Sequence, residues 1–483
     1  MLFTTPSFLF GFLPALLTCY FLAPAKLKNI LLLAFSLLFY SWGEPIYVIL
    51  LLISIAINYA TGIALLYAGS NGAKKIALFV GIALNLSILG YYKYRAFFTE
   101  VLYEALGASV LITDNVHLPI GISFFTFQAI SYLVDVYKGK AEPQKNIVLL
   151  ALYISLFPQL IAGPIVRYHD IQQSLTQRST GYVDMFIGIE RFILGLAKKM
   201  LIANPLGLIA DEVFGAPVDQ LSTGVLWIGA IAFFFQIYFD FSAYSDMAIG
   251  LGRMLGFRFM ENFNYPYISK SIKEFWRRWH ISLSTWFRDY LYIPLGGNRV
   301  SPARIYSNLL IVFILCGLWH GASWNFIVWG AYHGIFLLLE RSKAGLFLGG
   351  IWRPAQRLYV FFVVLVGWVI FRSNSLEQAG QYLLGMLGAR HDTEIYYFSF
   401  MFADPEFIYA IVLSILISSP MFLLIRKRIP FYHDLGLNGA PSIENSQSIL
   451  ALSFYSLFLL SLFLILMSYV SSSTYHPFIY FQF

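Results

Sequence analysis

The sequence predicts an all-α integral membrane protein that crosses the bilayer many times. Hydrophobic residues make up 59% of its 483 residues and charged residues only 12%, about half the share that is usual in a soluble domain. The mean hydropathy is +0.70. Apolar runs long enough to cross the hydrocarbon core recur along the chain. Because lipid offers the backbone no hydrogen-bond partners, these runs are expected to be helices.

We expect 11 or 12 membrane helices, which follow apolar runs broken at charges and turns. The 222–256 run is long and contains Asp240 and Asp246, so we expect it to bend. The expected spans are 7–25, 29–42, 46–68, 76–92, 146–165, 183–203, 222–256, 306–320, 324–342, 356–373, 406–425 and 448–470.

One membrane-embedded domain is expected over residues 1–483. Within it, residues 1–110 would form N-terminal helices, 111–345 the catalytic core and 346–483 C-terminal helices. The polar, turn-rich segment 429–447 is typical of an exposed loop.

Charge and cysteine content exclude several classes of function. The net charge of +7 suggests basic cytoplasmic loops. The sequence contains no dense Lys/Arg run of the kind that would indicate nucleic-acid binding. Cys19 and Cys316 lie in apolar runs without a C-x-x-C motif, so we expect buried thiols. The first apolar stretch is followed by Lys26 and Lys28 rather than preceded by basic residues, which predicts a retained first helix.

Segment 270–304 is basic and amphipathic. Apolar residues recur there at helical spacing, which predicts a helix too charged to cross lipid. One interpretation is an interfacial helix held by anionic lipid. The other is a funnel for an anionic carrier such as coenzyme A, whose phosphates suit pairs of arginines. Its seven basic and two acidic residues are Lys270, Lys273, Arg277, Arg278, Arg288, Arg299, Arg304, Glu274 and Asp289.

A glycine pair follows this predicted helix. Gly296 and Gly297, with Asn298 and Arg299 after them, could present backbone N–H groups to a phosphate. The commoner role of such a pair is to end a helix.

Two histidines are candidates for catalysis. His280 lies inside the predicted basic helix, and His320 lies near the end of an apolar run, between Trp319 and Gly321. An ionisable residue at membrane depth is costly and suggests a function. A neutral imidazole can accept the proton of an alcohol that attacks a thioester. The alternative is a histidine that only packs between helices.

Other polar residues in apolar runs have a structural explanation. We expect His333 to be structural, and Asp240 and Asp246 either to pack helices or to relay protons. Gly317/Gly321 and Gly330/Gly334 have the spacing of close helix contacts. His280, His320 and His333 lack metal-ligand spacing, so no metal site and no bound cofactor are expected.

Several long motifs resemble the membrane-bound O-acyltransferase family, in particular its bacterial alginate O-acetyltransferase branch. The resemblance covers most of the chain. The motifs are LPIGISFFTFQAISYLVDVYKGK (118–140), FPQLIAGPIVRYHD (157–170), YFDFSAYSDMAIGLG (238–252), EFWRRWHISLSTWFRDYLYIPLGGNR (274–299), GLWHGASWNFIVWGAYHG (317–334) and the ending FIYFQF.

The resemblance implies a fold and a site. His320 occupies the position of the family's W-H-G histidine, and His280 that of its W-R-R-W-H histidine. Family members arrange their helices as a ring around a thin centre, where a cytoplasmic and an extracytoplasmic funnel meet. The expected location is the inner membrane of a bacterium.

The expected function is O-acetylation of an exported polysaccharide such as alginate. Acetyl-CoA is the expected donor substrate, and His320 would act as general base or briefly carry the acetyl group, with His280 beside it. A partner protein outside the membrane would receive the acetyl group. The alternatives are a D-alanyl transferase of the teichoic acid type and a non-catalytic exporter of acyl groups or sugar. The residues expected to bind the donor are Arg277, Arg278, Arg288, Asn298 and Arg299.

Overall fold

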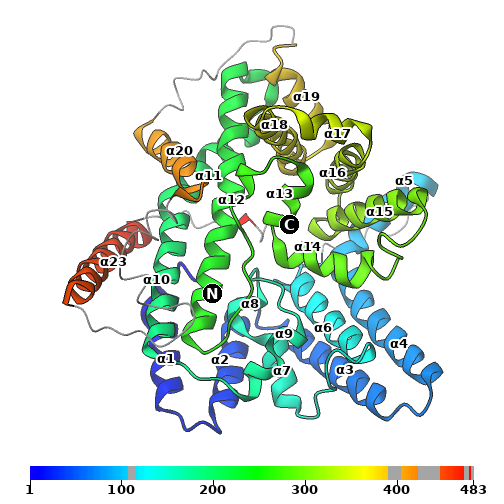
Figure 1. Cartoon of the computed structure of the whole chain (residues 1–483), viewed down its shortest axis with the longest axis vertical. Coiled ribbons are helices and arrows are strands. Elements are labelled where there is room, and N and C mark those ends of the chain that lie inside the picture. The colour runs from blue at the N-terminus through cyan, green and yellow to red at the C-terminus, as the bar shows by residue number, and fades with distance from the viewer. Residues whose placement is uncertain (107–115, 390–396, 398–403, 422–445, 473–477, 480–483) are drawn as a thin grey trace. The chain divides into compact units, whose positions relative to one another are not determined.

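The computed structural model describes residues 1–106, 116–389, 397, 404–421, 446–472 and 478–479 (Figure 1). Regular structure in these residues is helical, apart from an isolated bridge between Leu221 and Tyr397. Seven helices there have the length and composition to cross a membrane, and four are shorter apolar helices. The predicted class of polytopic all-α membrane protein is confirmed. The seven are Val48–Tyr67, Asn71–Leu106, Tyr182–Gly215, Thr223–Met254, Pro302–His320, Arg353–Arg372 and Leu452–Ser472; the shorter four are Ser7–Leu22, Lys28–Gly43, Ile122–Tyr137 and Pro405–Ile417.

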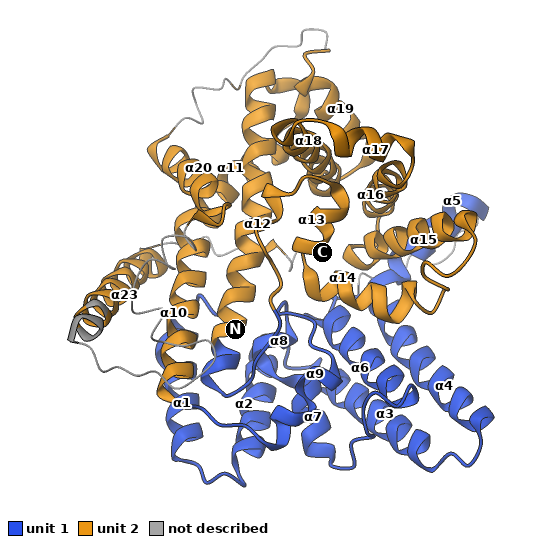
Figure 2. Cartoon of the chain, in the orientation of Figure 1, with its two compact units in different colours: residues 1–180, 251–260 blue, residues 181–250, 261–483 orange. Residues whose placement is uncertain are grey.

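The chain forms two compact units (Figure 2). Unit 1 comprises Met1–Thr180 and Leu251–Met260. The subdivision of the domain at residues 110 and 345 stays a prediction. The α-helices of unit 1 are α1 (Leu13–Leu22), α2 (Lys28–Gly43), α3 (Val48–Tyr67), α4 (Asn71–Leu89), α5 (Arg95–Leu106), α6 (Ile122–Tyr137), α7 (Ile147–Ser155), α8 (Phe157–Leu160) and α9 (Tyr168–Thr176).

One expected span of unit 1 differs from the structure, and one helix of unit 1 was not expected. The expected span 146–165 is wrong, because α7 ends at Ser155 and the short helix α8 starts at Phe157. Leu156 between them is extended (ψ 110°), so the backbone cannot continue as one helix. Helix α6 was missed as an apolar helix, because the polar side chains of Gln128 and Asp135 interrupt its apolar run; both are buried.

A buried amide pair joins two helices of unit 1. Asn58 on α3 donates to Asn85 Oδ1 at 3.1 Å, and Asn85 on α4 donates back to Asn58 Oδ1 at 3.0 Å. Such side-chain hydrogen bonds hold helices together where the surroundings are apolar.

Unit 2 comprises Gly181–Gly250 and Glu261–Phe483 and contains every predicted site residue. Its α-helices are α10 (Tyr182–Lys198), α11 (Asn204–Gly215), α12 (Thr223–Met254), α13 (Ile272–Arg278), α14 (Ile281–Phe287), α15 (Pro302–His320), α16 (Trp324–Arg341), α17 (Lys343–Gly350), α18 (Arg353–Arg372), α19 (Leu376–Met386), α20 (Pro405–Ile417) and α23 (Ser446–Ser472).

The two aspartates of α12 take part in packing. Asp240 is buried and pairs with Lys199 at 2.6 Å, and its other oxygen accepts the backbone N–H of Ile479 at 2.8 Å. Asp246 pairs with Arg191 and Lys198 at 2.8 and 2.6 Å. Helix α12 runs as one uninterrupted α-helix from Thr223 to Met254, so these pairings need no break in its hydrogen bonds.

Helices α15 and α16 cross with their backbones in close approach. A Cβ atom at Gly317 would overlap the carbonyl oxygen of Phe326, and one at Gly330 would overlap the carbonyl oxygen of Phe313. Small residues allow helices to approach this closely. The crossing therefore fixes the end of α15, where His320 lies.

The basic segment is not one amphipathic helix, and this prediction was wrong. Helix α13 ends at Arg278 and α14 begins at Ile281. Between them His280 has φ 42° and ψ 55°, the left-handed conformation, which an α-helix cannot accommodate. His280 therefore sits at a break rather than inside a helix.

We predict that Gly317→Ala destabilises the protein by about 1–3 kcal/mol, because α15 must move away from Phe326 to make room for the methyl group. Thermal unfolding of the purified protein in detergent measures this effect. Gly380→Ala on α19 is the control, because a Cβ there meets no atom within 4 Å. Equal stability of Gly317→Ala and Gly380→Ala would contradict the close crossing.

Candidate functional site

The start of α13 is held by one carboxylate and one hydroxyl. Ser271 Oγ accepts the backbone N–H of Glu274 at 3.0 Å. Glu340 of α16 accepts the N–H of Ile272 at 2.5 Å and that of Lys273 at 2.9 Å. These acceptors satisfy N–H groups that a helix start otherwise leaves unpaired. The basic residues of α13 are therefore presented from a fixed backbone.

Arg278 is used within the fold rather than in an open site. Its Nε donates to Glu274 at 3.0 Å and its Nη1 donates to the carbonyl oxygen of Asn264 at 3.0 Å. Burial alone would raise the pKa of Glu274, but the Lys270 N–H and the Arg278 guanidinium bring that pKa below its ordinary value. The carboxylate therefore stays ionised as the partner of Arg278.

The glycine pair after α14 makes a turn. The N–H of Gly296 donates to Ile293 at 3.0 Å, that of Gly297 to Tyr292 at 2.9 Å, and that of Arg299 back to Gly296 at 3.0 Å. Both glycines have positive φ, 108° and 54°. These three N–H groups are bonded within the turn, which is the helix-ending role of such a pair, and the interpretation as a backbone phosphate cradle stays a prediction.

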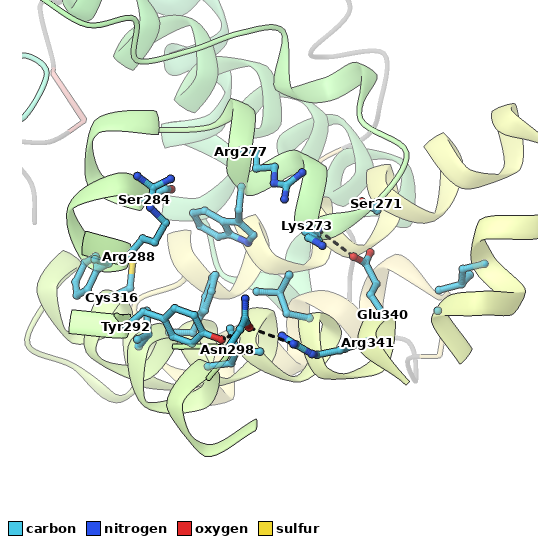
Figure 3. Close-up of a pocket in the computed structure, with 18 of the residues that line it drawn as sticks. Ser271, Lys273, Arg277, Ser284, Arg288, Tyr292, Asn298, Cys316, Glu340 and Arg341 are labelled. Atoms are coloured by element: carbon cyan, nitrogen blue, oxygen red, sulfur yellow. Dashed lines mark hydrogen bonds between the residues drawn. The ribbon is translucent and has the colours of Figure 1, made fainter. Parts of the chain in front are cut away.

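A cavity of about 660 Å³ lies among α13 to α17 (Figure 3). Its lining includes five basic side chains and one acidic one. Of the predicted donor-binding residues, Arg277, Arg288 and Asn298 line it, while Arg278 and Arg299 do not. The charged and polar lining residues are Lys270, Ser271, Lys273, Arg277, Ser284, Arg288, Tyr292, Asn298, Glu340 and Arg341.

The polar lining is partly bonded to itself. Asn298 Oδ1 accepts from the Tyr292 hydroxyl at 2.8 Å and from Arg341 Nη2 at 3.1 Å. Arg288 pairs with Asp289 at 2.7 Å. Figure 3 shows the contact between Asn298 and Arg341 across one side of the cavity. These contacts hold hydrogen-bond donors of the side chains in place along the wall of the cavity.

The inner part of the cavity is apolar. Trp276 and Cys316 line it and are 7% and 6% exposed. The Trp276 ring lies edge-on to Trp329 and His333, with ring centroids 5.7 and 5.2 Å away. Cys316 lies four residues before His320 on α15, which is about one helical turn or roughly 6 Å along the axis.

His320 is enclosed by aromatic side chains of three helices. It is 5% exposed. Its ring centroid lies 4.9 Å from Trp319, 5.1 Å from Trp329 and 5.4 Å from Phe371. His320 does not line the cavity itself, but its turn of α15 follows the turn that does. The ring therefore faces protein rather than open hydrocarbon.

His280 also packs against Trp319. The Trp319 ring centroid is 6.1 Å from His280 and 4.9 Å from His320, so one indole contacts both predicted catalytic imidazoles. His280 is 1% exposed, and its Nδ1 lies 3.1 Å from Asn262 Oδ1. Burial lowers the pKa of His280 to about 3, so the ring is neutral at physiological pH.

Several residues of the site could not be predicted from local sequence. Trp276 was assigned to the apolar face of a helix, and Cys316 was expected only as a buried thiol. Asn262 and Glu340 carry no motif of their own; only the fold brings them to His280 and to α13. His333 is fully buried against tryptophans, and its structural role stays a prediction.

Comparison with known proteins supports a common family. The model of the membrane-bound O-acyltransferase family matches residues 144–348. The probable alginate O-acetylase of Azotobacter vinelandii is 46% identical over 78% of this chain and 76% of that protein. The peptidoglycan O-acetyltransferase of Helicobacter pylori is 38% identical over 80% of each chain. The teichoic acid D-alanyltransferase of Bacillus subtilis is 31% identical over 45% of this chain and 58% of that protein.

The family match spans both predicted histidines and all but two of the residues that line the cavity, Gly349 and Tyr359. The likeness to the alginate and peptidoglycan enzymes covers far more of the chain than the likeness to the D-alanyltransferase does. The chain belongs to the membrane-bound O-acyltransferase family and is a multi-pass O-acyltransferase.

Proposed function

We propose that this enzyme moves an acetyl group from cytoplasmic acetyl-CoA towards a hydroxyl of an exported polysaccharide. The observation that carries the proposal is a cavity with a basic rim, whose apolar inner part at Cys316 lies one helical turn from the enclosed His320. Relatives named as alginate O-acetylase and peptidoglycan O-acetyltransferase support acetyl as the group and polysaccharide as the acceptor.

The lining of the cavity suits the donor. Lys273 and Arg277 are exposed at its rim, and Arg288 extends the basic surface. Guanidinium groups bind phosphate through paired, charge-assisted hydrogen bonds. The apolar part at Trp276 and Cys316 suits the uncharged arm that ends in the thioester. The volume of about 660 Å³ is in the range of small-molecule sites, roughly 300–1,000 Å³.

His320 supplies the base in this proposal. The acceptor hydroxyl gives its proton to the neutral imidazole while its oxygen bonds to the acetyl carbonyl carbon. The carbon–sulfur bond then breaks, the electron pair leaves with sulfur, and the imidazolium returns the proton to the thiolate. If the ring carries the acetyl group, its nitrogen first attacks the thioester carbon and the carbon–sulfur bond breaks, with the electron pair leaving on sulfur. The hydroxyl oxygen then attacks the acetyl carbon, the carbon–nitrogen bond breaks to restore the neutral imidazole, and the hydroxyl proton passes to the thiolate. The aromatic enclosure keeps out water that would hydrolyse the thioester.

The remaining steps concern the outer face of the membrane. In the proposed pathway the acetyl group reaches a partner protein outside a bacterial inner membrane, and that protein modifies the glycan. Alginate is the first candidate acceptor, because the relative that is 46% identical carries it in its name. A carrier-fed D-alanyl transfer is less well supported, because that likeness covers 45% of the chain.

Paired substitutions test the catalytic and binding roles. His320→Ala is expected to lower kcat by roughly 10²–10⁴-fold with little change in the KM for acetyl-CoA, because it removes the proton acceptor. Arg288→Ala is expected to raise that KM about tenfold, because it removes a charge-assisted contact. Release of free coenzyme A by the protein in membrane vesicles, with labelled acetyl-CoA, measures both.

Arg304→Ala is the control for charge, because Arg304 belongs to the same basic segment but does not line the cavity. Unchanged turnover in His320→Ala would reject its role. An equal rise of KM in Arg304→Ala and Arg288→Ala would show that the enzyme senses overall charge rather than this cavity.

Cys316 offers a direct test of where the donor sits. A small thiol reagent is expected to modify Cys316 through the cavity, and acetyl-CoA at about ten times its Kd should slow that reaction roughly tenfold. Labelling is followed by peptide mass spectrometry. Cys19 is exposed on α1, so the expectation of a buried thiol was wrong for this residue. It is the internal control and should react at the same rate with and without acetyl-CoA. If saturating acetyl-CoA did not slow the labelling of Cys316, the donor would bind elsewhere.

A further inference from the structure

The break between α13 and α14 is held by an extended segment of unit 2. The N–H of Asn264 donates to the carbonyl oxygen of Arg278 at 2.9 Å, and the N–H of Ile281 donates to the carbonyl oxygen of Asn262 at 2.9 Å. These two backbone hydrogen bonds lie on either side of His280. They stabilise a left-handed conformation that is otherwise uncommon for a residue with a side chain.

The side chain of Asn262 continues this contact. It is 1% exposed, and its Oδ1 lies 3.2 Å from the backbone nitrogen of Ser282, 2.9 Å from the Ser282 hydroxyl and 3.1 Å from His280 Nδ1. A backbone N–H can only donate, so the amide atom that faces Ser282 must be the oxygen. That same oxygen can only accept from His280. The Ser282 hydroxyl also lies 3.4 Å from His280 Nδ1, but its single hydrogen is taken by the shorter contact with Asn262 Oδ1. Nδ1 of His280 therefore carries the hydrogen that Asn262 Oδ1 accepts.

This hydrogen determines what the other ring nitrogen can do. A neutral imidazole has one N–H, so a ring protonated at Nδ1 carries its lone pair at Nε2. Three uncharged rings pack against His280, those of Phe241, Phe263 and Trp319, with centroids 4.6, 6.5 and 6.1 Å away. Nε2 therefore accepts a proton or a hydrogen bond.

We propose that Asn262 is a positioning residue for acyl transfer, which holds His280 as the Nδ1–H tautomer. Nε2 of His280 then accepts a proton or a hydrogen bond and does not donate one to the acyl oxyanion. The inference rests on the proposed function, because it requires His280 to act in the reaction. It deepens that function by assigning the reactive nitrogen and by excluding an oxyanion-stabilising role for this ring.

Asn262→Asp tests the assignment through the pH dependence of the rate. A carboxylate beside Nδ1 favours the imidazolium and should raise the pKa of His280 by about 1–3 units. The protonated ring cannot accept, so activity should be lost as the pH falls through the raised pKa and return as the pH rises. The acid limb of the kcat/KM profile is expected to move to higher pH relative to the wild type.

Asn262→Ala separates positioning from binding. It is expected to lower kcat about tenfold to a hundredfold, because the ring can then adopt either tautomer. The KM for acetyl-CoA should stay the same, because Asn262 does not line the cavity. Asn264→Ala is the matched control: it removes a side-chain amide from the same segment and keeps the backbone hydrogen bonds. A purely structural role would change yield and thermal stability without moving the pH profile.

The wild-type protein allows the same test without a variant of Asn262. ¹⁵N NMR of histidine-labelled protein, with the spectrum of His280→Gln subtracted, is expected to show a protonated Nδ1 and an unprotonated Nε2. An Nε2–H tautomer, or an Asn262→Asp enzyme with a wild-type pH profile, would overturn the inference. If His280→Ala kept full activity, the proposed role of His280 itself would fall. An inactive His280→Ala with an unshifted Asn262→Asp profile would remove only the role of Asn262.

Discussion

The close crossing of α15 and α16 is the constraint on which the centre depends. Gly317 and Gly330 let the two backbones meet without side chains between them. This contact places the end of α15, and with it His320, against Trp329 of α16. An imidazole at membrane depth is costly unless protein encloses it. The crossing supplies that enclosure, while the turn of α15 before it still faces the cavity at Cys316.

The same helix pair supports the basic wall of the cavity. Glu340, near the end of α16, accepts the first N–H groups of α13 and so fixes the helix that carries Trp276 and Arg277. Immediately after α13, His280 is held at a backbone break by Asn262. The donor surface and both imidazoles therefore belong to one connected set of contacts within unit 2.

The class of the protein and its two candidate catalytic histidines could be predicted from the sequence, and the detailed site could not. Apolar run length is a local property, so most membrane helices were predictable. His320 and His280 stand in distinctive motifs, which made them candidates. The break at His280 escaped prediction because helical spacing continues through it, and only bonds from Asn262 and Asn264 stabilise its left-handed backbone. Arg278 was assigned to the donor, although Glu274 stands four residues earlier, at the spacing of a helical ion pair, and is its actual partner.

The central claim is that the thioester of the donor reaches His320 through the cavity beside Cys316. A cryo-electron-microscopy structure with a non-cleavable acetyl-CoA analogue tests it most directly. We expect phosphates against Arg277 and Arg288, and an acetyl carbonyl carbon about 3–3.5 Å from an imidazole nitrogen of His320. Analogue bound outside this cavity, or a carbonyl that the Trp276 and Trp329 rings separate from His320, would contradict it.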